Sequence, residues 1–212
     1  MSTSLVIQEP SSPTRLFLLF HGVGATPQSL APLGDVLARS FPKAVVVSIQ
    51  APDESDFGQG YQWFSVQGVT EENRVERIEA VMPAFVDTVK YWQQKTDLNA
   101  EQTTLIGFSQ GAIMSLSSMQ MVDEKLAEKI VSLSGRFAVL PNRVPKKAPN
   151  RELWNTQIHF IHGNQDNVID YRLSKSGYDA LIDCGAMTTY DLIPHLAHSV
   201  NQAAVDCLLQ RL

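Results

Sequence analysis

The sequence predicts an α/β protein, with helices on both faces of a mostly parallel sheet of about seven strands. Short apolar runs that suggest strands alternate with helical patterns to the end of the chain. This alternation is typical of parallel sheets covered by helices. The 212 residues show no internal repeat, linker or low-complexity tract, so we expect residues 1–212 to form a single domain.

Composition and charge set aside several classes of protein. Hydrophobic residues make up 44% of the chain and charged residues 18%, and the net charge is −5. No basic stripe suggests nucleic acid binding. Residues 1–10 lack the basic segment and the long apolar run of a signal peptide, and no stretch approaches the roughly 20 apolar residues of a membrane span. We therefore expect a cytoplasmic enzyme or binding protein without a membrane span.

The cysteines and histidines show no metal-site pattern. Cys184 and Cys207 have neither metal-ligand spacing nor a disulfide framework, and we expect two buried thiols. The histidines include two close pairs, His159 with His162 and His195 with His198. Each is only a pair, without a carboxylate or thiolate partner at metal-site spacing. The sequence therefore predicts neither a metal nor an organic cofactor.

The first half of the chain contains three expected strands and two expected helices. Strands are expected over residues 5–7, 16–20 and 45–49, and helices over about residues 28–40 and 71–94. The second and third strands are continuous apolar runs, as in strands covered on both faces. The first ends at a proline-containing turn, which is typical of an edge strand. Residues 51–69 are expected to form a loop that contains glycines and aromatic residues.

The expected helix over residues 71–94 is the longest element. Its apolar residues recur at helical spacing, and Thr70 is a suitable N-cap with acidic residues in the first turn. Pro83 lies inside this pattern, and we expect it to kink or split the helix.

The second half continues the alternation. Strands are expected over residues 103–106, 130–133, 158–162 and 188–193, and helices from Ala112, over about residues 171–184 and over about residues 199–209. Gly185 is the expected stop of the second of these helices. Residues 136–156 are irregular and contain prolines. They are too few for a lid domain, and two interpretations stay open: a flap beside an open, shallow site, or a solvated loop.

A Gly-Phe-Ser-Gln-Gly sequence joins the strand at 103–106 to the helix that follows. This strand–turn–helix context is what a G-x-S-x-G nucleophile elbow requires. The turn is tight enough to hold Ser109 in a strained backbone conformation, and Cβ atoms at Gly107 and Gly111 would meet the neighbouring strand and helix. The N–H groups at the start of the helix point to the same place, where they would stabilise an anion. A glycine-rich turn without catalytic function is the alternative interpretation.

Three polar residues follow three different strands in the order Ser109, Asp166 and His198. This is the order of the catalytic triad in α/β-hydrolases. In that interpretation His198 takes the serine proton and returns it to the leaving group, while Asp166 fixes the imidazole tautomer. The oxyanion needs two backbone donors, for which we expect the N–H of Gln110 and, from the glycine-rich loop 21–24, the N–H of Val23.

Four motifs extend across nearly the whole chain: LFHGVG at residues 19–24, GFSQGA at 107–112, HGNQDNVI at 162–169 and LAHSV at 196–200. With them the sequence resembles the phospholipase/carboxylesterase family of small serine esterases, which includes acyl-protein thioesterases, and within it the bacterial esterase branch. The Trp63-Phe64 pair before a helix is a further similarity. The resemblance implies a single-domain α/β-hydrolase fold, the triad Ser109, Asp166 and His198, and the oxyanion-hole residues Val23 and Gln110.

The chain departs from the family pattern at two positions. Ala25 stands where an aspartate is common after His-Gly-x-Gly, and Ala197 stands where a glycine commonly precedes the final histidine. Neither change removes a catalytic group, but Ala25 argues against a polar role for that residue of the loop.

Several residues compete for roles in the site. His195 is the alternative base, and Asp170 is the alternative acid, although Asp170 is also placed to cap the following helix. His21 is expected to shape its loop by hydrogen bonding. Met114 is expected in the core. The candidates for substrate binding are Trp63, Phe64 and Leu196, of which the two aromatic residues could instead belong to the core.

The sequence thus predicts a serine carboxylesterase that hydrolyses short-chain esters through an acyl-enzyme on Ser109. A thioesterase acting on acyl-protein or acyl-CoA substrates, or a lysophospholipase, is the alternative, because one oxyanion hole serves both esters and thioesters. A non-catalytic binding protein with this fold is the remote alternative. The expected partner is a small-molecule ester substrate, and a homodimer is left open.

Overall fold

The computed structural model describes residues 4–141 and 155–212. A seven-stranded sheet forms its centre, with the strand order β1-β3-β2-β6-β7-β8-β9, and every neighbouring pair is parallel except β1 with β3. The strands are β1 (Leu5–Gln8), β2 (Arg15–Phe20), β3 (Ala44–Ile49), β6 (Thr103–Phe108), β7 (Lys129–Leu133), β8 (Gln157–Gly163) and β9 (Thr188–Ile193). The predicted α/β class and the predicted edge strand near the N-terminus are confirmed, and the structure shows that this strand pairs antiparallel with β3.

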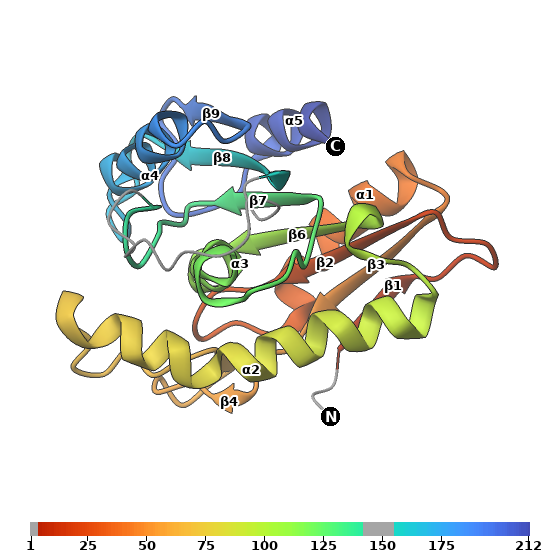
Figure 1. Cartoon of the computed structure of the whole chain (residues 1–212), viewed down its shortest axis with the longest axis horizontal. Helices are drawn as coiled ribbons and strands as arrows, with labels where there is room; N and C mark the ends of the chain where they lie inside the picture. Colours follow the sequence, from red (N-terminus) through yellow and green to blue (C-terminus); the bar gives the residue numbers. More distant parts are fainter. Residues whose placement is uncertain (1–3, 142–154) are drawn as a thin grey trace.

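Helices cover both faces of this sheet (Figure 1). They are α1 (Ala31–Ser40), α2 (Glu71–Thr96), α3 (Gln110–Met121), α4 (Tyr171–Asp183) and α5 (Gln202–Arg211), with short 3₁₀ turns at Pro27–Leu30 and Ala100–Gln102. Residues of α2, α3 and α4 share one apolar core with the sheet, and residues of α1 and α5 share the other. Along β2, Leu16, Leu18 and Phe20 enter the first core, and Phe17 and Leu19 enter the second, because successive side chains of a strand alternate between faces.

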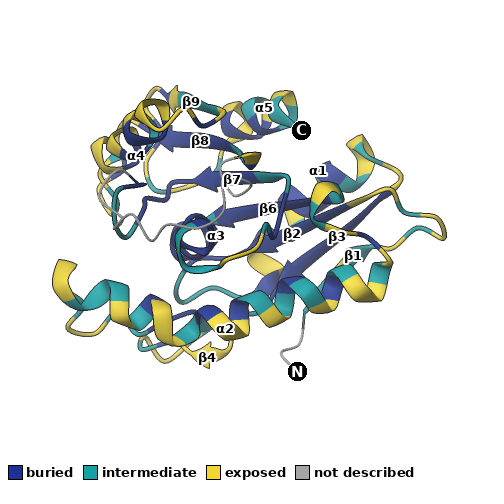
Figure 2. Ribbon diagram, viewed as in Figure 1, coloured by how far each residue is buried: buried dark blue, intermediate teal, exposed yellow. Residues whose placement is uncertain are grey.

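Burial explains why the strands are apolar on both sides. The central strands are buried along their length, whereas α2 turns an exposed face to solvent (Figure 2). Met114 of α3 is fully buried in the first core, as predicted. Among the helices of residues 4–141 and 155–212, none is both long and apolar enough to cross a membrane.

The long helix α2 is continuous, so of the two effects expected of Pro83, a kink or a split, the split is wrong. A proline removes the hydrogen bond to the carbonyl four residues earlier, that of Glu79. Both residues are exposed, so water can solvate this carbonyl. Ile78, Met82 and Phe85, on the buried face, hold the helix against the core. At its start, Thr70 and Asn73 form the predicted N-cap as a reciprocal capping box.

Other expectations need correction. The loop 51–69 contains a small antiparallel pair, β4 (Asp53–Glu54) with β5 (Tyr61–Gln62). The last helix begins at Gln202 rather than near Ser199, because Asn201 caps it by accepting a hydrogen bond from the Ala204 N–H. Residues 142–154 of the expected flap lie outside the described residues.

The prediction of two buried thiols is also wrong. Cys184 is exposed and Cys207 is half-buried, and both are free. Cys184 is the C-cap of α4, directly before the predicted stop at Gly185. The end of a surface helix points towards solvent there, which explains the exposure.

Close contact between β2 and α3 depends on Gly111. A Cβ built at Gly111 would lie 2.1 Å from the backbone oxygen of Phe20. We expect Gly111→Ala to lower the free energy of unfolding by about 3 kcal/mol, because a strand backbone cannot yield as a side chain can. Urea unfolding measures this. Gly58→Ala is the matched control: Gly58 has φ +74° but no atom within 4 Å of the added Cβ, so only the left-handed backbone should cost stability, about 1 kcal/mol. Equal losses in both variants would contradict the steric explanation.

A buried histidine on β8 makes stability depend on pH. Burial, together with nearby Lys129 and Arg211, lowers the pKa of His159 to about 4. Its Nδ1 lies 2.8 Å from Thr189 Oγ1, and its Nε2 has no hydrogen-bond partner among the described residues. The unfolded chain, with a pKa near 6.5, binds this proton more readily than the folded one, so acid destabilises the fold from about pH 6.5 down to about 4.

Replacing this histidine should reduce the acid sensitivity. Between pH 7.5 and 4.5 we expect the His159→Asn variant to lose about 2 kcal/mol less unfolding free energy than the wild-type protein. Asparagine can present a polar atom near the position of Nδ1, towards Thr189. Urea titrations at the two pH values test this, and equal losses in both proteins would refute it.

Candidate active site

Ser109 occupies the turn between β6 and α3. Its backbone has φ 54° and ψ −115°, and its N–H donates to the Leu133 carbonyl at 2.9 Å. A Cβ at Gly107 would lie 2.4 Å from the Cα of Ala112, and one at Gly111 would lie 2.1 Å from the Phe20 oxygen. The structure therefore has the strained, glycine-flanked turn that the sequence predicts. The strain persists because β6 and α3 are both fixed by the core.

The side chains of Ser109, His198 and Asp166 form a chain of hydrogen bonds. Ser109 Oγ lies 2.9 Å from His198 Nε2, and His198 Nδ1 lies 2.7 Å from Asp166 Oδ2. A carboxylate can only accept, so Nδ1 carries the proton and Nε2 is free to accept the serine hydroxyl. The Phe108 ring, 4.9 Å from the imidazole between centroids, packs against His198 and limits its rotation.

Asp166 accepts three hydrogen bonds and has one further imidazole beside it. The N–H groups of Val168 and Ile169 donate to Oδ1, each at 2.9 Å. His198 Nδ1 donates to Oδ2, and His162 Nε2 lies 3.1 Å from the same oxygen. Burial alone would raise the pKa of Asp166, but hydrogen bonds from His198, Ile169 and Val168 outweigh it and hold the pKa below its usual value. The carboxylate is therefore ionised and fixed in orientation at neutral pH.

The contact of His162 with Asp166 is the feature that the sequence analysis missed. His162 Nε2 donates to the Ile169 carbonyl at 2.9 Å and also faces Asp166. Burial lowers the pKa of His162, so its ring is neutral at pH 7. The i, i+4 spacing of His162 and Asp166 within the HGNQD motif is the signal that the sequence contains for this contact. His159 and His162 are three positions apart on β8, so they point to opposite faces of the sheet.

The alternative residues lie elsewhere. His195 is exposed, with φ 59°, and its Nδ1 contacts Gln165 at 3.3 Å rather than Ser109. Asp170 accepts from the Arg172 N–H at 2.9 Å and caps α4, as its alternative interpretation predicted. Within residues 4–141 and 155–212, no three His, Cys, Asp or Glu side chains gather as metal ligands.

The loop after β2 lies beside Ser109. A Cβ at Gly22 would be 3.2 Å from the Ser109 Cβ, which places the backbone next to the expected oxyanion. His21 shapes this loop as predicted: it accepts from the Ala51 N–H at Nε2 (3.2 Å), so its Nδ1–H donates to the Gly22 carbonyl (2.7 Å). Burial lowers the pKa of His21 and keeps the ring neutral.

Backbone pairing holds the loop at Ala25, the position where an aspartate is common in the resembled family. The N–H of Gly24 donates to the Tyr61 carbonyl at 2.9 Å, and the N–H of Tyr61 donates to the Ala25 carbonyl at 2.8 Å. The loop is thereby held by β5 without a side-chain carboxylate. The position of the Val23 N–H relative to a substrate oxyanion remains a prediction.

Gln110 connects the elbow to the segment after β5. Its side-chain oxygen accepts from the Trp63 N–H, and its side-chain nitrogen donates to the Phe64 carbonyl, both at 2.7 Å. The Gln110 side chain is thus engaged, and its own N–H lies at the start of α3, as the oxyanion prediction requires. That role also remains a prediction.

The three predicted substrate-binding side chains are buried. Trp63 packs in the core, 5.6 Å from Phe20 and 5.3 Å from Phe85 between ring centroids. Phe64 lies in the same core, and Leu196 in the core on the opposite face. Trp63 and Phe64 therefore lie in the core, which was the alternative interpretation for these two residues. Contact of any of the three with a substrate is untested.

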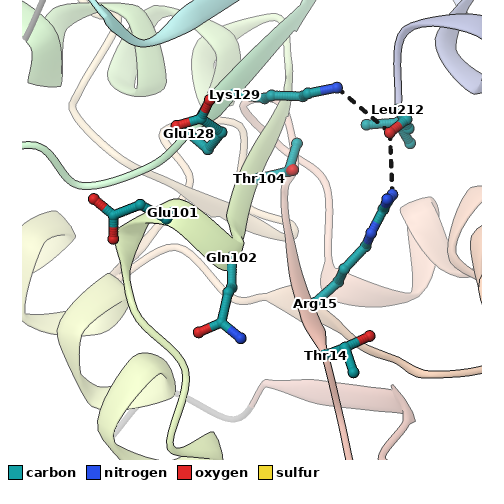
Figure 3. A pocket seen from close by; sticks show the side chains of 8 residues that line it. All are labelled: Thr14, Arg15, Glu101, Gln102, Thr104, Glu128, Lys129 and Leu212. Carbon is teal, nitrogen blue, oxygen red and sulfur yellow. Dashed lines mark hydrogen bonds between the residues drawn. The ribbon is translucent and has the colours of Figure 1, made fainter.

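Two cavities lie at opposite edges of the sheet. One of about 630 Å³ adjoins the carboxyl ends of the strands, between α2, the segment after β7 and α4. The other, about 230 Å³ and shown in Figure 3, lies where β2, β6 and β7 begin. There Arg15 and Lys129 both donate to the Leu212 oxygen, at 3.0 and 3.4 Å. Of these two cavities, the first is at the edge that carries Ser109.

Known proteins resemble this chain in sequence. The family model described as Phospholipase/Carboxylesterase matches residues 2–212. Esterase YpfH of Escherichia coli (strain K12) is 41% identical over 98% of this chain and 86% of its own. Acyl-protein thioesterase 1 of Neurospora crassa is 26% identical over 96% of this chain and 88% of its own.

Solved structures agree on the architecture. The crystal structure of esterase PE8 has a TM-score of 0.83 at 24% identity, with 99% of this chain and 96% of that chain covered. The carboxylesterase of Bacillus cereus has a TM-score of 0.78 at 17% identity, with 100% and 93% covered. The predicted α/β-hydrolase fold is confirmed.

Variants of Asp166 and Asp170 can distinguish a carboxylate that orients the imidazole of His198 from one that caps a helix. We expect Asp166→Asn to slow covalent labelling of Ser109 by a fluorophosphonate by about 10⁴-fold, which is the loss of kcat that the same change causes in a serine-protease triad, because it favours the wrong imidazole tautomer. Asp170→Asn should label at the wild-type rate, since asparagine caps a helix as well as aspartate does. A fluorescent probe followed over time measures both rates. Comparable slowing in the two variants would contradict the assignment of Asp166.

Proposed function

The chain belongs to the phospholipase/carboxylesterase family of ester hydrolases, and on that premise we propose that it cleaves short-chain carboxylic esters through an acyl-enzyme on Ser109. One observation carries the proposal: Asp166, His198 and Ser109 are joined by hydrogen bonds of 2.7 and 2.9 Å. A buried, strained serine beside an imidazole of fixed tautomer has what a nucleophile needs.

Acylation begins when Ser109 Oγ attacks the ester carbonyl carbon and its proton passes to His198 Nε2. The carbonyl oxygen becomes an oxyanion, which the N–H groups of Gln110 and Val23 stabilise, each by roughly 3–4 kcal/mol. Asp166 stabilises the imidazolium. When the bond to the alcohol breaks, the imidazolium returns its proton to the leaving oxygen, and the acyl group stays on Ser109.

Deacylation repeats these steps with water as the nucleophile. His198 removes a proton from water, the hydroxide adds to the acyl carbon, and Ser109 leaves with the proton that His198 returns. The products are the carboxylic acid and the free enzyme. Every proton moves between His198 and an oxygen atom of Ser109, the leaving alcohol or water.

The length of the segment between β7 and β8 favours accessible, short-chain esters. At about twenty residues it is too short to fold as a separate lid domain. Thioesters are the second candidate, because an oxyanion hole accepts the carbonyl oxygen of either substrate. The similarity to acyl-protein thioesterase 1 of Neurospora crassa favours this candidate.

A series of p-nitrophenyl esters from acetate to palmitate tests the proposal. We expect turnover that is highest for short chains in the wild-type protein, and a loss of about 10⁶-fold in kcat for Ser109→Ala. Ser117→Ala is the control: this serine lies on α3, and its buried hydroxyl has no hydrogen-bond partner among the described residues.

Each outcome has a distinct meaning. An Ser109→Ala variant as active as the wild-type protein would reject Ser109 as the nucleophile. Turnover of acyl-CoA or acylated peptides, without turnover of oxygen esters, would favour the thioesterase. No turnover of any substrate and no fluorophosphonate labelling would leave a binding protein.

A further inference from the structure

The cavity at the carboxyl edge has apolar walls and one buried cation. Val75 of α2, Phe137 after β7 and Leu173 of α4 line it, together with Arg136 and Glu71. In Figure 1 the beginning of α2 and helix α4 lie at the left, the side towards which the arrowheads of β7 and β8 point. The cavity, about 630 Å³, is large enough for a small acyl chain.

Arg136 is buried, although not all of its hydrogen-bond donors have partners. The residue is only 8% exposed, yet its Nε has no hydrogen-bond partner among the described residues. Its Nη2 donates to Glu71 Oε2. A buried guanidinium normally needs its donors satisfied, because removing a charge from water is costly. The described residues therefore leave a donor of Arg136 unsatisfied in a side chain that lines the cavity.

The partner of Arg136 is exposed and shared. The Glu71 side chain is 63% exposed, and its second oxygen accepts from Arg74 Nη1 at 2.6 Å. The hydrogen bond from Arg136, more than that from Arg74, lowers the pKa of Glu71, so the carboxylate is ionised at neutral pH. Because Glu71 is exposed and stays paired with Arg74, the loss of its pairing with Arg136 to another anion costs little free energy.

Arg136 is also close in structure to the nucleophile. The Leu133 carbonyl, three residues earlier, accepts the N–H of Ser109. Gly135 packs against α3, since a Cβ there would lie 2.3 Å from the Cβ of Ala112. The segment that carries Arg136 thus leaves the sheet beside the elbow and runs into the wall of the cavity.

We propose that Arg136 binds a carboxylate on the acyl part of the substrate, so that the preferred substrates are monoesters of short dicarboxylic acids. The apolar side chains would cover the methylene groups, and the guanidinium would take the place of Glu71 as the partner of the far carboxylate. This inference rests on the proposed function of Ser109.

A matched pair of substrates isolates the far carboxylate. The p-nitrophenyl monoester of adipic acid and p-nitrophenyl hexanoate have six-carbon acyl chains that differ only in a terminal carboxylate in place of a methyl group. We expect Arg136→Gln to lower kcat/KM for the adipate ester roughly tenfold or more, mainly through KM, and to leave that for the hexanoate within about twofold.

Variants of two neighbouring residues test whether the preference for the adipate ester can be raised as well as lowered. Glu71→Gln removes the competing carboxylate and should raise kcat/KM for the adipate ester by up to about fivefold, without a gain for the hexanoate. Arg74→Gln is the control, because Arg74 binds the same glutamate but does not line the cavity. It should change the adipate-to-hexanoate ratio by less than about twofold. Thermal unfolding checks that each variant folds. If Arg136→Gln does not fold, Arg136→Lys is tested in its place.

The outcomes separate this inference from the proposed function. If the wild-type protein hydrolyses neither ester, the proposed function is at fault. Two results would overturn the inference while the hexanoate is still hydrolysed: Arg136→Gln lowers kcat/KM equally for both esters, or Glu71→Gln fails to raise the adipate-to-hexanoate ratio. In either case Arg136 only connects α2 to the sheet.

Discussion

The close approach of α3 to the sheet is the constraint on which the rest of the site depends. Gly107 and Gly111 have no room for a Cβ, because backbone atoms of the neighbouring helix and strand occupy that space. In the turn between them, Ser109 has the strained φ of 54°. The same turn starts α3, so the first free N–H groups of that helix and the serine hydroxyl share one small region. Tight packing of apolar elements thus produces the local polarity that the proposed chemistry requires.

Around this turn, the site is assembled from loops at the carboxyl ends of parallel strands. β2 leads to Gly22, β8 leads to Asp166, and β9 leads to His198. Asp166 is the centre of the hydrogen bonding, because its two oxygens accept from two backbone amides and face two imidazoles. His162 places a neutral imidazole beside Oδ2 and adds no charge there. The carboxylate is therefore held at several points before any substrate binds, and its orientation does not depend on His198 alone.

The same edge of the sheet carries the cavity with Arg136. Its cation is buried and partly satisfied, while its glutamate partner is exposed and shared. Chemistry at Ser109 and selection of a charged substrate would then use separate groups: Asp166 and His198 act on the ester bond, and Arg136 acts on the far end of the acyl chain. Separation of this kind allows substrate preference to change without disturbing the reacting atoms.

Much of the fold and the site could be predicted from the sequence, because the signals are local. Apolar runs and helical spacing revealed the sheet and its helices, and the glycines at 107 and 111 revealed the elbow. The order of Ser109, Asp166 and His198 indicated one site. Contacts between distant segments had no local signal. The tertiary structure decided three features: the exposure of Pro83 and Glu79, which allows α2 to continue, the contact of His162 with Asp166, and the burial of Arg136. Each depends on which surfaces the elements turn towards one another when they pack.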